Sequence, residues 1–412
     1  MDGEVGRFDF LTHSVFTGDE QVFNTGRDVF EPLTGKEYYR TRGFKEISMI
    51  FGCVEGSYRK TTALINRVRY HQKDGTPCST LQDNVELESS KLNQSIDNKA
   101  LHLLKTNGFN EQGGYEGKNE EYVNDKSVSM NKEDLEKAIQ VCQAKSGLTD
   151  SISGNPVFYE DPKMTVNISA DDVNVKKQKE NRKTQGSESD SDRKYVHNTI
   201  FHIECNGRSY TLNGAGTVNV LLLLIAFLLN NDLLKYHLRF FVDGQRTLHA
   251  AILKAFTWYK SISLILDWYH LEEKCKIQLS LALNGRIIRN KILDEIIPLL
   301  WYGLVDKAID HLGTVADSAI KNRKELEKLI QYFERNKPYM PCYALRKDLG
   351  LRNSSNKGEK MNDLIVSERQ KHNGMSWSQC GSVALASLTA LKRNREHVKW
   401  FREGDIDFKL AA

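Results

Sequence analysis

The chain has 412 residues, of which 40% are hydrophobic and 27% charged, and its formal net charge is +4 at pH 7. This is the composition of a soluble globular protein with room for two or three domains. The charge is uneven, because residues 335–403 hold 14 Lys and Arg against 6 Asp and Glu, leaving −4 for the rest. A net +8 there fits either a phosphate-binding surface or a set of solvated helix faces.

The seven cysteines are odd in number and include no Cys-x-x-Cys pair, which argues against a disulfide framework and a zinc module. The longest apolar run, Val220–Leu229, is shorter than the roughly 20 residues that a membrane-spanning helix needs. The first ten residues lack the basic flank and apolar core of a signal peptide. We therefore expect a reduced, cytoplasmic protein with no membrane partner.

The N-terminal region, residues 1–56, has a mixed pattern in which Phe44–Gly52 fits a strand or a short helix. Residues 57–109 predict two helices, a basic one from Ser57 and a second one that Ser79 or Thr80 can cap. Such a pair is compatible with a helix-turn-helix that binds DNA, and equally with two ordinary surface helices.

Residues 110–164 predict a linker and one helix. Asn110–Asp125 is polar and glycine-rich, and Asn131–Ser146 has a modest helical pattern. Farther on, Lys176–Lys194 contains almost no apolar residue, so we expect a mobile loop there. The basic residues of this loop should contact DNA phosphates: Lys176, Lys177, Lys179, Arg182 and Lys183.

Five strands are predicted from apolar and alternating runs, namely Thr165–Val173, Tyr195–Cys205, Arg208–Leu212, Leu238–Val242 and Ser261–Leu266. Asn206–Gly207 marks a hairpin between the second and third strands. Helices are expected at Val218–Leu234 and Thr247–Ala255. The order β-β-β-α-β-α-β-α is that of the ribonuclease H fold. Residues 165–270 therefore predict an α/β domain with a mixed five-stranded sheet.

Three acidic positions follow this order. Asp171 and Asp172 end the first strand, Asp243 ends the fourth and is followed by Gly244, and Glu359 begins a later helical pattern. In the ribonuclease H fold, acids stand at these three places. Which of the two adjacent aspartates matters is open at this point.

The 116 residues from Asp243 to Glu359 are too many for one strand and one helix, so residues 271–353 should form a helical insertion. Its expected helices are Leu271–Leu283, Ile287–Leu300, Val305–Leu312 and Ala316–Arg335. Residues 354–412 would then hold the catalytic helix and a basic tail.

Carboxylates that converge from two strands and a helix suit phosphodiester chemistry. Two Mg²⁺ ions about 3.5–4 Å apart activate the attacking oxygen and stabilise the leaving one, and Mg²⁺ prefers carboxylates and water. We expect Asp171, Asp243 and Glu359 to be catalytic and to bind two Mg²⁺ or Mn²⁺ ions, with Asp243 bridging them. Taken singly, Asp243–Gly244 is also an ordinary turn and Glu359 an ordinary helix N-terminal acid.

The chain resembles bacterial insertion-sequence transposases of the Mutator-like DDE type over about Thr165–Arg395. The resemblance lies in VNISADDV, FFVDGQRTLHAAI, ILDWYHLEEK and GEKMNDLIVSERQKHNGMSW. It implies the helical insertion, the Asp243–Gly244 pair, and an Arg-x-Lys after the glutamate, here Arg369 and Lys371. Many relatives carry Cys-x-x-His after the fifth strand. In this chain Asp267 stands in place of the cysteine, as a structural substitute, and His270 matches.

The resemblance implies a transposase that binds the terminal inverted repeats of its element, cleaves there and joins the ends to target DNA. We expect His270, Arg369 and Lys371 to contact DNA, and a homodimer or larger assembly associated with the nucleoid. Two alternatives are a domesticated or inactive relative that only binds DNA and a ribonuclease H-like nuclease that cuts branched DNA. The acids argue against the first, and the insertion and basic tail argue against the second.

Overall fold

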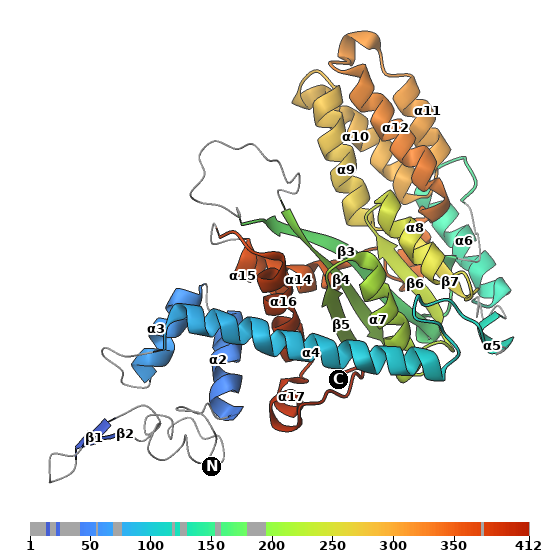
Figure 1. The fold of residues 1–412 in the computed structure, drawn as a ribbon. Helices are drawn as coiled ribbons and strands as arrows, with labels where there is room; N and C mark the ends of the chain where they lie inside the picture. The colour runs from blue at the N-terminus through green and yellow to red at the C-terminus, as the bar shows by residue number, and fades with distance from the viewer. Residues whose placement is uncertain are drawn as a thin grey trace.

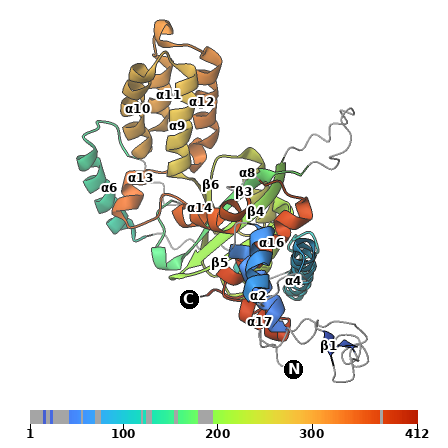
Figure 2. The same ribbon diagram turned by 90° about the vertical axis from the view of Figure 1, so that its left-hand side faces the viewer.

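The computed structural model describes residues 14–16, 22–24, 42–54, 57–68, 76–117, 120–123, 130–152, 158–178, 195–371 and 375–411. The architecture is α/β, with a five-stranded mixed sheet, helices on both of its faces and a helical bundle standing beyond one end (Figures 1 and 2). Within these ranges, no helix has the length and apolar character needed to cross a membrane.

The five strands of the sheet are β3 (Thr165–Lys176), β4 (Tyr195–Cys205), β5 (Arg208–Gly214), β6 (His237–Val242) and β7 (Ile262–Leu266). Their order is β5-β4-β3-β6-β7. The β3–β4 and β4–β5 pairs are antiparallel, whereas β3–β6 and β6–β7 are parallel. The predicted single mixed sheet is therefore confirmed. The predicted hairpin is also present, with both Asn206 and Gly207 in the left-handed region at φ 48° and 79°.

The two faces of the sheet are covered by different helices because side chains alternate along each strand. Ile168, Ile203 and Tyr210 lie side by side across β3, β4 and β5. The Tyr210 ring is 4.5 Å from that of Phe227 on α7 (Thr217–Asn230), which occupies this face together with α8 (Arg246–Ala255). Ser169 points to the opposite face and contacts Gly358 of α14 (Asn356–Asn362). Helix α16 (Gln379–Arg393) packs on the same side.

A bundle of four helices separates β7 from α14. They are α9 (Trp268–Ala282), α10 (Arg286–Trp301), α11 (Val305–Gly313) and α12 (Arg323–Asn336). The bundle has its own apolar core, which reaches the sheet at Phe241 and Ile265. The predicted helical insertion is thus present, but its last helix begins at Arg323 and not at Ala316, because Asp317–Ala319 forms a separate 3₁₀ turn, η5.

The insertion is followed by η6 (Lys337–Tyr339) and α13 (Tyr343–Asp348), and the chain ends after α17 (His397–Glu403). Before the sheet come the short pair β1 (Ser14–Phe16) and β2 (Val22–Asn24), then α2 (Arg42–Val54), α3 (Tyr58–Val68), α4 (Cys78–Thr106), α5 (Glu120–Val123), α6 (Lys132–Ser146) and η4 (Pro162–Met164). The Phe44–Gly52 run is therefore helical. The 29-residue α4 packs against both α7 and α16 (Figure 1), and the helix-turn-helix stays a prediction.

The segment expected to be a linker, Asn110–Asp125, is packed in its described part. Tyr115 and Tyr122 lie 5.9 and 5.7 Å, ring to ring, from Trp258 at the end of α8. Phe109 completes the group at 4.8 Å from Trp258. The described part of this segment is therefore packed against the core through two aromatic side chains among its polar residues, and the linker assignment stays a prediction.

A buried ion pair joins β6 to the segment that precedes η4. Arg239 on β6 is 0% exposed and pairs with Glu160, which is 1% exposed. Removing one partner of a buried pair leaves an uncompensated charge in the interior. Replacing Glu160 by Ala should therefore lower the free energy of unfolding by about 3–5 kcal/mol in urea titrations. The exposed Lys276–Glu272 pair is the control, and Lys276→Ala should cost less than about 1 kcal/mol. Equal losses would contradict this.

Candidate functional site

Two of the predicted acids lie next to each other because of the pairing register of β3 and β6. Thr165 is paired with His237 and Ser169 with Phe241, an offset of 72 residues, and the same 72 residues separate Asp171 from Asp243. Residues at the same height on neighbouring parallel strands share a face and lie about 4.8 Å apart. Asp171 and Asp243 therefore reach the same edge of the sheet on the same side.

The turn after β6 holds Asp243 in place. The Asp243 Oδ1 atom accepts a hydrogen bond of 2.9 Å from the backbone N–H of Gln245. Gly244 has φ +89°, and a Cβ there would lie 2.7 Å from the Tyr332 hydroxyl. Glycine is required on both counts, because it adopts positive φ without strain and leaves room for the tyrosine ring. Tyr332 donates a hydrogen bond of 3.2 Å to the Asp243 carbonyl.

The third acid comes from α14. A Cβ on Gly358 would lie 2.4 Å from the Ser169 Cβ, so the helix approaches β3 as closely as backbone allows. Glu359 follows directly, and Asn362 lies one turn later on the same face of the helix. The helix then continues through a π-helical segment, η7 (Asp363–Ser367), and α15 (Glu368–Gln370). Such π segments are frequent at functional sites.

All three acids line one small pocket. Its lining comprises Ser169, Ala170, Asp171, Phe241, Val242, Asp243, His270, Ser355, Gly358, Glu359 and Asn362. The enclosed space is about 10 Å³, which is room for about one water-sized particle. The Asp171 carboxylate accepts hydrogen bonds from the Asp172 backbone N–H at 2.8 Å and from the Asn362 side-chain amide at 2.6 Å.

The pocket concentrates negative charge without a built-in counter-charge. Burial, and secondarily the Asp243 carboxylate, raises the pKa of Asp171. Burial, and secondarily Asp267, raises the pKa of Glu359. The Glu359 Oε1 atom is buried and accepts no hydrogen bond. Among the described residues, no Lys or Arg nitrogen lies within 4 Å of the Asp171, Asp243 or Glu359 carboxylates.

His270 and Asp267 complete the surroundings of Glu359. The His270 Nε2 atom is 3.5 Å from Glu359 Oε1. Asp267, His270 and Glu359 each offer a ligand atom within 4.8 Å of the others. The Asp267 carboxylate, however, is 0% exposed and already accepts four hydrogen bonds, from the N–H groups of Tyr269, His270 and Ser355 and the Ser355 hydroxyl. It therefore caps α9 and holds the start of α14, which agrees with the structural substitute expected at this position.

Asp172 is directed away from this pocket. Its carboxylate accepts a hydrogen bond of 2.5 Å from the Thr199 hydroxyl on β4, and neighbouring residues of a strand point to opposite faces. Of the two adjacent aspartates, Asp171 is thus the one that lies with Asp243 and Glu359.

The basic residues expected to bind DNA lie in different settings. Lys176 is exposed at the end of β3, and Lys177 is half-buried beside Trp377. Lys371 is exposed after α15, and Arg182 lies outside the described residues. Arg369 is 3% exposed, with its guanidinium 5.2 and 5.4 Å from the rings of Tyr58 and Trp377. The guanidinium is buried between these two rings, and the predicted DNA contact of Arg369 stays a prediction.

Several site residues were missed at the sequence level. Asn362 had a usable signal, since it lies three residues after Glu359 and so faces the same way on a helix. Ser355 and Tyr332 had no such signal, because their roles depend on tertiary contacts.

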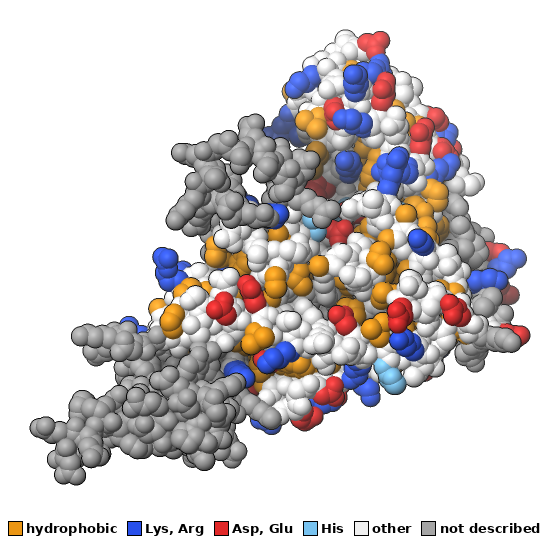
Figure 3. Space-filling view, viewed as in Figure 1, with side chains coloured by type: hydrophobic (Ala, Val, Ile, Leu, Met, Phe, Trp, Pro, Cys, Tyr) orange, Lys and Arg blue, Asp and Glu red, His pale blue; other side chains and the backbone are white. Residues whose placement is uncertain are grey.

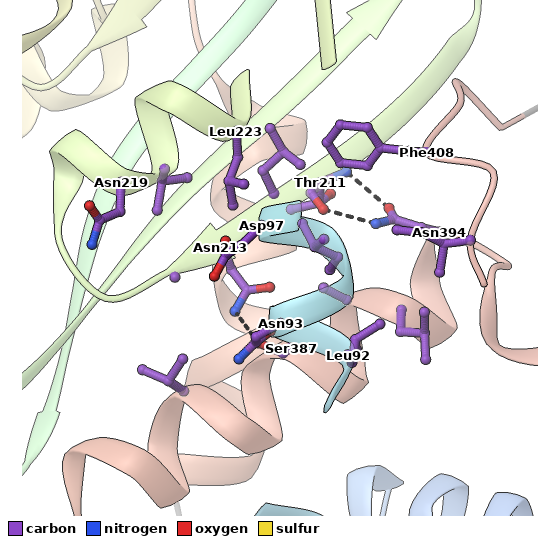
Figure 4. Close-up of a pocket in the computed structure, with 18 of the residues that line it drawn as sticks. Leu92, Asn93, Asp97, Thr211, Asn213, Asn219, Leu223, Ser387, Asn394 and Phe408 are labelled. Carbon is purple, nitrogen blue, oxygen red and sulfur yellow. Dashed lines mark hydrogen bonds between the residues drawn. The ribbon is translucent and has the colours of Figure 1, made fainter. Parts of the chain in front are cut away.

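A larger pocket of about 230 Å³ lies between α4, β5, α7 and α16 (Figure 4). None of the three acids lines it, and there Asn394 makes two hydrogen bonds, of 2.9 and 2.8 Å, to the backbone of Thr211.

The donor set of the small pocket fits a hard divalent cation. The three carboxylates line one pocket, one has an oxygen with no hydrogen-bond donor, and no lysine or arginine pairs with them among the described residues. In that part of the chain, the group whose ligand atoms all lie within 4.8 Å of one another is Asp267, His270 and Glu359, and it does not include Asp171 or Asp243. Oxygen ligands of this kind suit Mg²⁺ or Mn²⁺. Asp171, Asp243 and Glu359 are the residues that would hold it. The expectation of two ions stays a prediction, because the enclosed space has room for about one.

Comparisons of the chain with protein-family models, with curated proteins and with solved structures gave no match.

The close approach of α14 to β3 is testable by a matched pair of substitutions. Gly358→Ala would place a methyl group 2.4 Å from the Ser169 Cβ, and such overpacking costs about 1–3 kcal/mol. Ser169→Gly removes that Cβ, so the double variant should recover most of the loss. Thermal unfolding of the four proteins measures this coupling. A double variant no more stable than Gly358→Ala would show that α14 is not held by this contact.

The raised pKa of Glu359 predicts a pH-dependent effect on stability. In the metal-free protein the charged carboxylate opposes folding at neutral pH, and this opposition is removed as the pH falls through the raised pKa. Glu359→Gln should therefore raise the melting temperature by roughly 2 °C at neutral pH, and the gain should vanish near pH 4, the ordinary carboxyl range. Glu403→Gln, on an exposed residue, should change little at any pH. A gain that grows as the pH falls would contradict this.

Proposed function

We propose that the chain is a DDE-type DNA transposase with a ribonuclease H-like catalytic domain, in which Asp171, Asp243 and Glu359 form the catalytic centre. The single observation that carries the proposal is that these three residues, drawn from two strands and a helix, line one pocket. The strand order β5-β4-β3-β6-β7, with its antiparallel and parallel halves, supports the fold assignment. The bundle between β7 and α14 supports the insertion-bearing type of this fold.

The clustering of acids is informative because it is unfavourable in the absence of a cation. Close carboxylates repel each other, and burial removes the water that would screen them. A purely structural role would provide a lysine, arginine or amide partner for each. Within the described part of the chain, Asp171 receives a side-chain amide from Asn362, and the basic group next to Glu359 is the His270 imidazole at 3.5 Å. The unfavourable arrangement is explained if the three residues bind a divalent cation.

In this proposal the residues of the chain hold the reacting groups in line. When bound, Mg²⁺ or Mn²⁺ would supply the activation of the attacking oxygen and the stabilisation of the leaving oxygen. Asp243 is fixed by its turn, Asp171 by Asn362, and Glu359 by the packing of Gly358 on Ser169. A water molecule as nucleophile gives cleavage, and a DNA 3′-hydroxyl at the same position gives strand transfer. Both reactions exchange one oxygen for another on phosphorus.

The substrate in this proposal is double-stranded DNA. The enzyme would act on the terminal inverted repeats of its own element and on target DNA, and as a homodimer or larger assembly, because two ends are joined together. Exposed Lys176 and Lys371 remain proposed phosphate contacts.

The test is cleavage of a labelled DNA fragment that contains the sequences flanking the chain's own gene, in the presence of Mg²⁺. Asp171→Ala, Asp243→Ala and Glu359→Ala should each lower the cleavage rate at least about a hundredfold, because bound metal contributes several kcal/mol to the transition state. Binding of the fragment and the far-ultraviolet circular dichroism should stay close to wild type.

Asp172→Ala is the matched control, since it alters the neighbouring carboxylate that bonds to Thr199. It should keep most of the activity. Full activity in Asp243→Ala or Glu359→Ala would end the proposal. Fragment binding without any cleavage by the wild-type protein would favour an inactive, DNA-binding relative, and cleavage confined to branched DNA would favour a structure-specific nuclease.

A further inference from the structure

Helix α12 of the insertion is attached to the turn that carries Asp243. Tyr332 donates a hydrogen bond to the Asp243 carbonyl at 3.2 Å, and Arg335 donates one to the Gly244 carbonyl at 3.5 Å. The tyrosine ring fits where Gly244 has no side chain. The side chains of this part of α12 are therefore adjacent to the acid pocket, although they come from a separate apolar core.

Two cations flank the Tyr332 ring. The Lys274 Nζ atom, from α9, lies 5.8 Å from the ring centroid, and the Arg335 guanidinium carbon lies 5.4 Å from it. Both distances are within the range of cation–π attraction, which positions the two charges without neutralising them. Neither side chain has a carboxylate within 4 Å among the described residues. The Arg335 Nε atom also has no hydrogen-bond acceptor.

We propose that Lys274 and Arg335, positioned by Tyr332, bind a phosphate of the DNA strand that enters the acid pocket. This inference rests on the proposed function, and it names the part of the insertion that receives the substrate. The site was not visible at the sequence level, where the phosphate contacts were assigned to the loop after β3 and to the residues around Glu359.

Charge is the first reason for this assignment. A DNA strand that approaches three carboxylates is repelled unless positive charge is close by. Arg335 contacts the Gly244 carbonyl, and Lys274 lies over the tyrosine that contacts Asp243. The guanidinium of Arg335 presents several N–H donors, which suit phosphate oxygens, and Lys274 adds a flexible point charge. The bundle face in Figure 3 carries further Lys and Arg side chains, with acidic ones among them.

Two other lysines of these helices are paired with acidic residues. Lys276 on α9 pairs with Glu272 at 2.5 Å, and Lys328 on α12 pairs with Glu325 at 2.6 Å. Lys328 precedes Arg335 by seven residues, which is about 10 Å along a helix. These two lysines therefore form a matched control, with the same number of charges on the same helices but farther from Asp243 or already neutralised.

The experiment compares the double variant Lys274→Gln/Arg335→Gln with the control Lys276→Gln/Lys328→Gln. Binding of a fluorescein-labelled DNA duplex of arbitrary sequence is measured over a series of KCl concentrations without divalent cations. Each neutralised phosphate contributes about 0.9 to the slope of log K against log salt, and the two cations share one phosphate, so the first variant should lose about 0.9. The control should keep nearly the wild-type slope. Glutamine retains most of the side-chain length, and melting temperatures identify any variant that is misfolded.

An unchanged slope in the first variant, or an equal loss in both variants, would overturn the inference. The outcome is separable from that of the proposed function, because the binding assay needs no catalysis. A reduced slope in a protein that never cleaves DNA would support the phosphate site and contradict the transposase proposal. Metal-dependent cleavage with an unchanged slope would support the transposase proposal and contradict the phosphate site.

Discussion

The juxtaposition of Asp171 and Asp243 is the constraint on which the rest of the structure depends. The register of β3 against β6 brings two carboxylates to the same height on neighbouring strands, and α14 adds a third. Nothing in a folded sheet requires this, and the repulsion between like charges on neighbouring strands works against it. Fully buried strands that precede the acids, such as β6 with its Phe240, Phe241 and Val242, supply the stability that tolerates the repulsion. The site is therefore sustained by the hydrophobic packing beneath it.

Asp267 connects the point where the helical bundle begins to the point where the chain returns to the sheet. Its carboxylate caps α9 and also accepts hydrogen bonds from Ser355, at the start of α14. The Trp268 N–H donates to the Asn353 carbonyl at 3.0 Å. The chain therefore leaves the domain and returns to it at one point. Because entry and exit are tied there, the bundle can keep its own core while His270 and Glu359 remain adjacent.

Much of this arrangement followed from local patterns. The five strands, the hairpin at Asn206–Gly207 and the need for an insertion were predictable, because each depends on periodicity, turn residues or chain length. The grouping of Asp171, Asp243 and Glu359 also followed, since the order of the elements determines which strand ends meet. The choice between Asp171 and Asp172 did not, because it depends on which face of β3 packs against α14.

Other features depend on contacts between distant segments. Arg369 has the same charge as an exposed arginine, and only its position between Tyr58 and Trp377 makes it part of the core. Tyr115 and Tyr122 looked like isolated aromatics in a polar stretch, whereas α8 gives them a packing partner. Lys274 and Arg335 both contact the Tyr332 ring, although Lys274 lies on α9 and Arg335 on α12. At such a separation along the chain, residue spacing does not predict which side chains meet.

The π-helical segment after Glu359 has a mechanical consequence. Residues beyond it belong to the same continuous helical stretch, and at its far end Arg369 donates a hydrogen bond of 3.3 Å to the Gly52 carbonyl on α2 and lies over Tyr58 of α3. The stretch formed by α14, η7 and α15 carries Glu359 near its start and contacts the N-terminal helices α2 and α3 at its end. A displacement of α2 and α3 would therefore be transmitted to the helix that carries Glu359, with the π-helical segment lying between the two contacts.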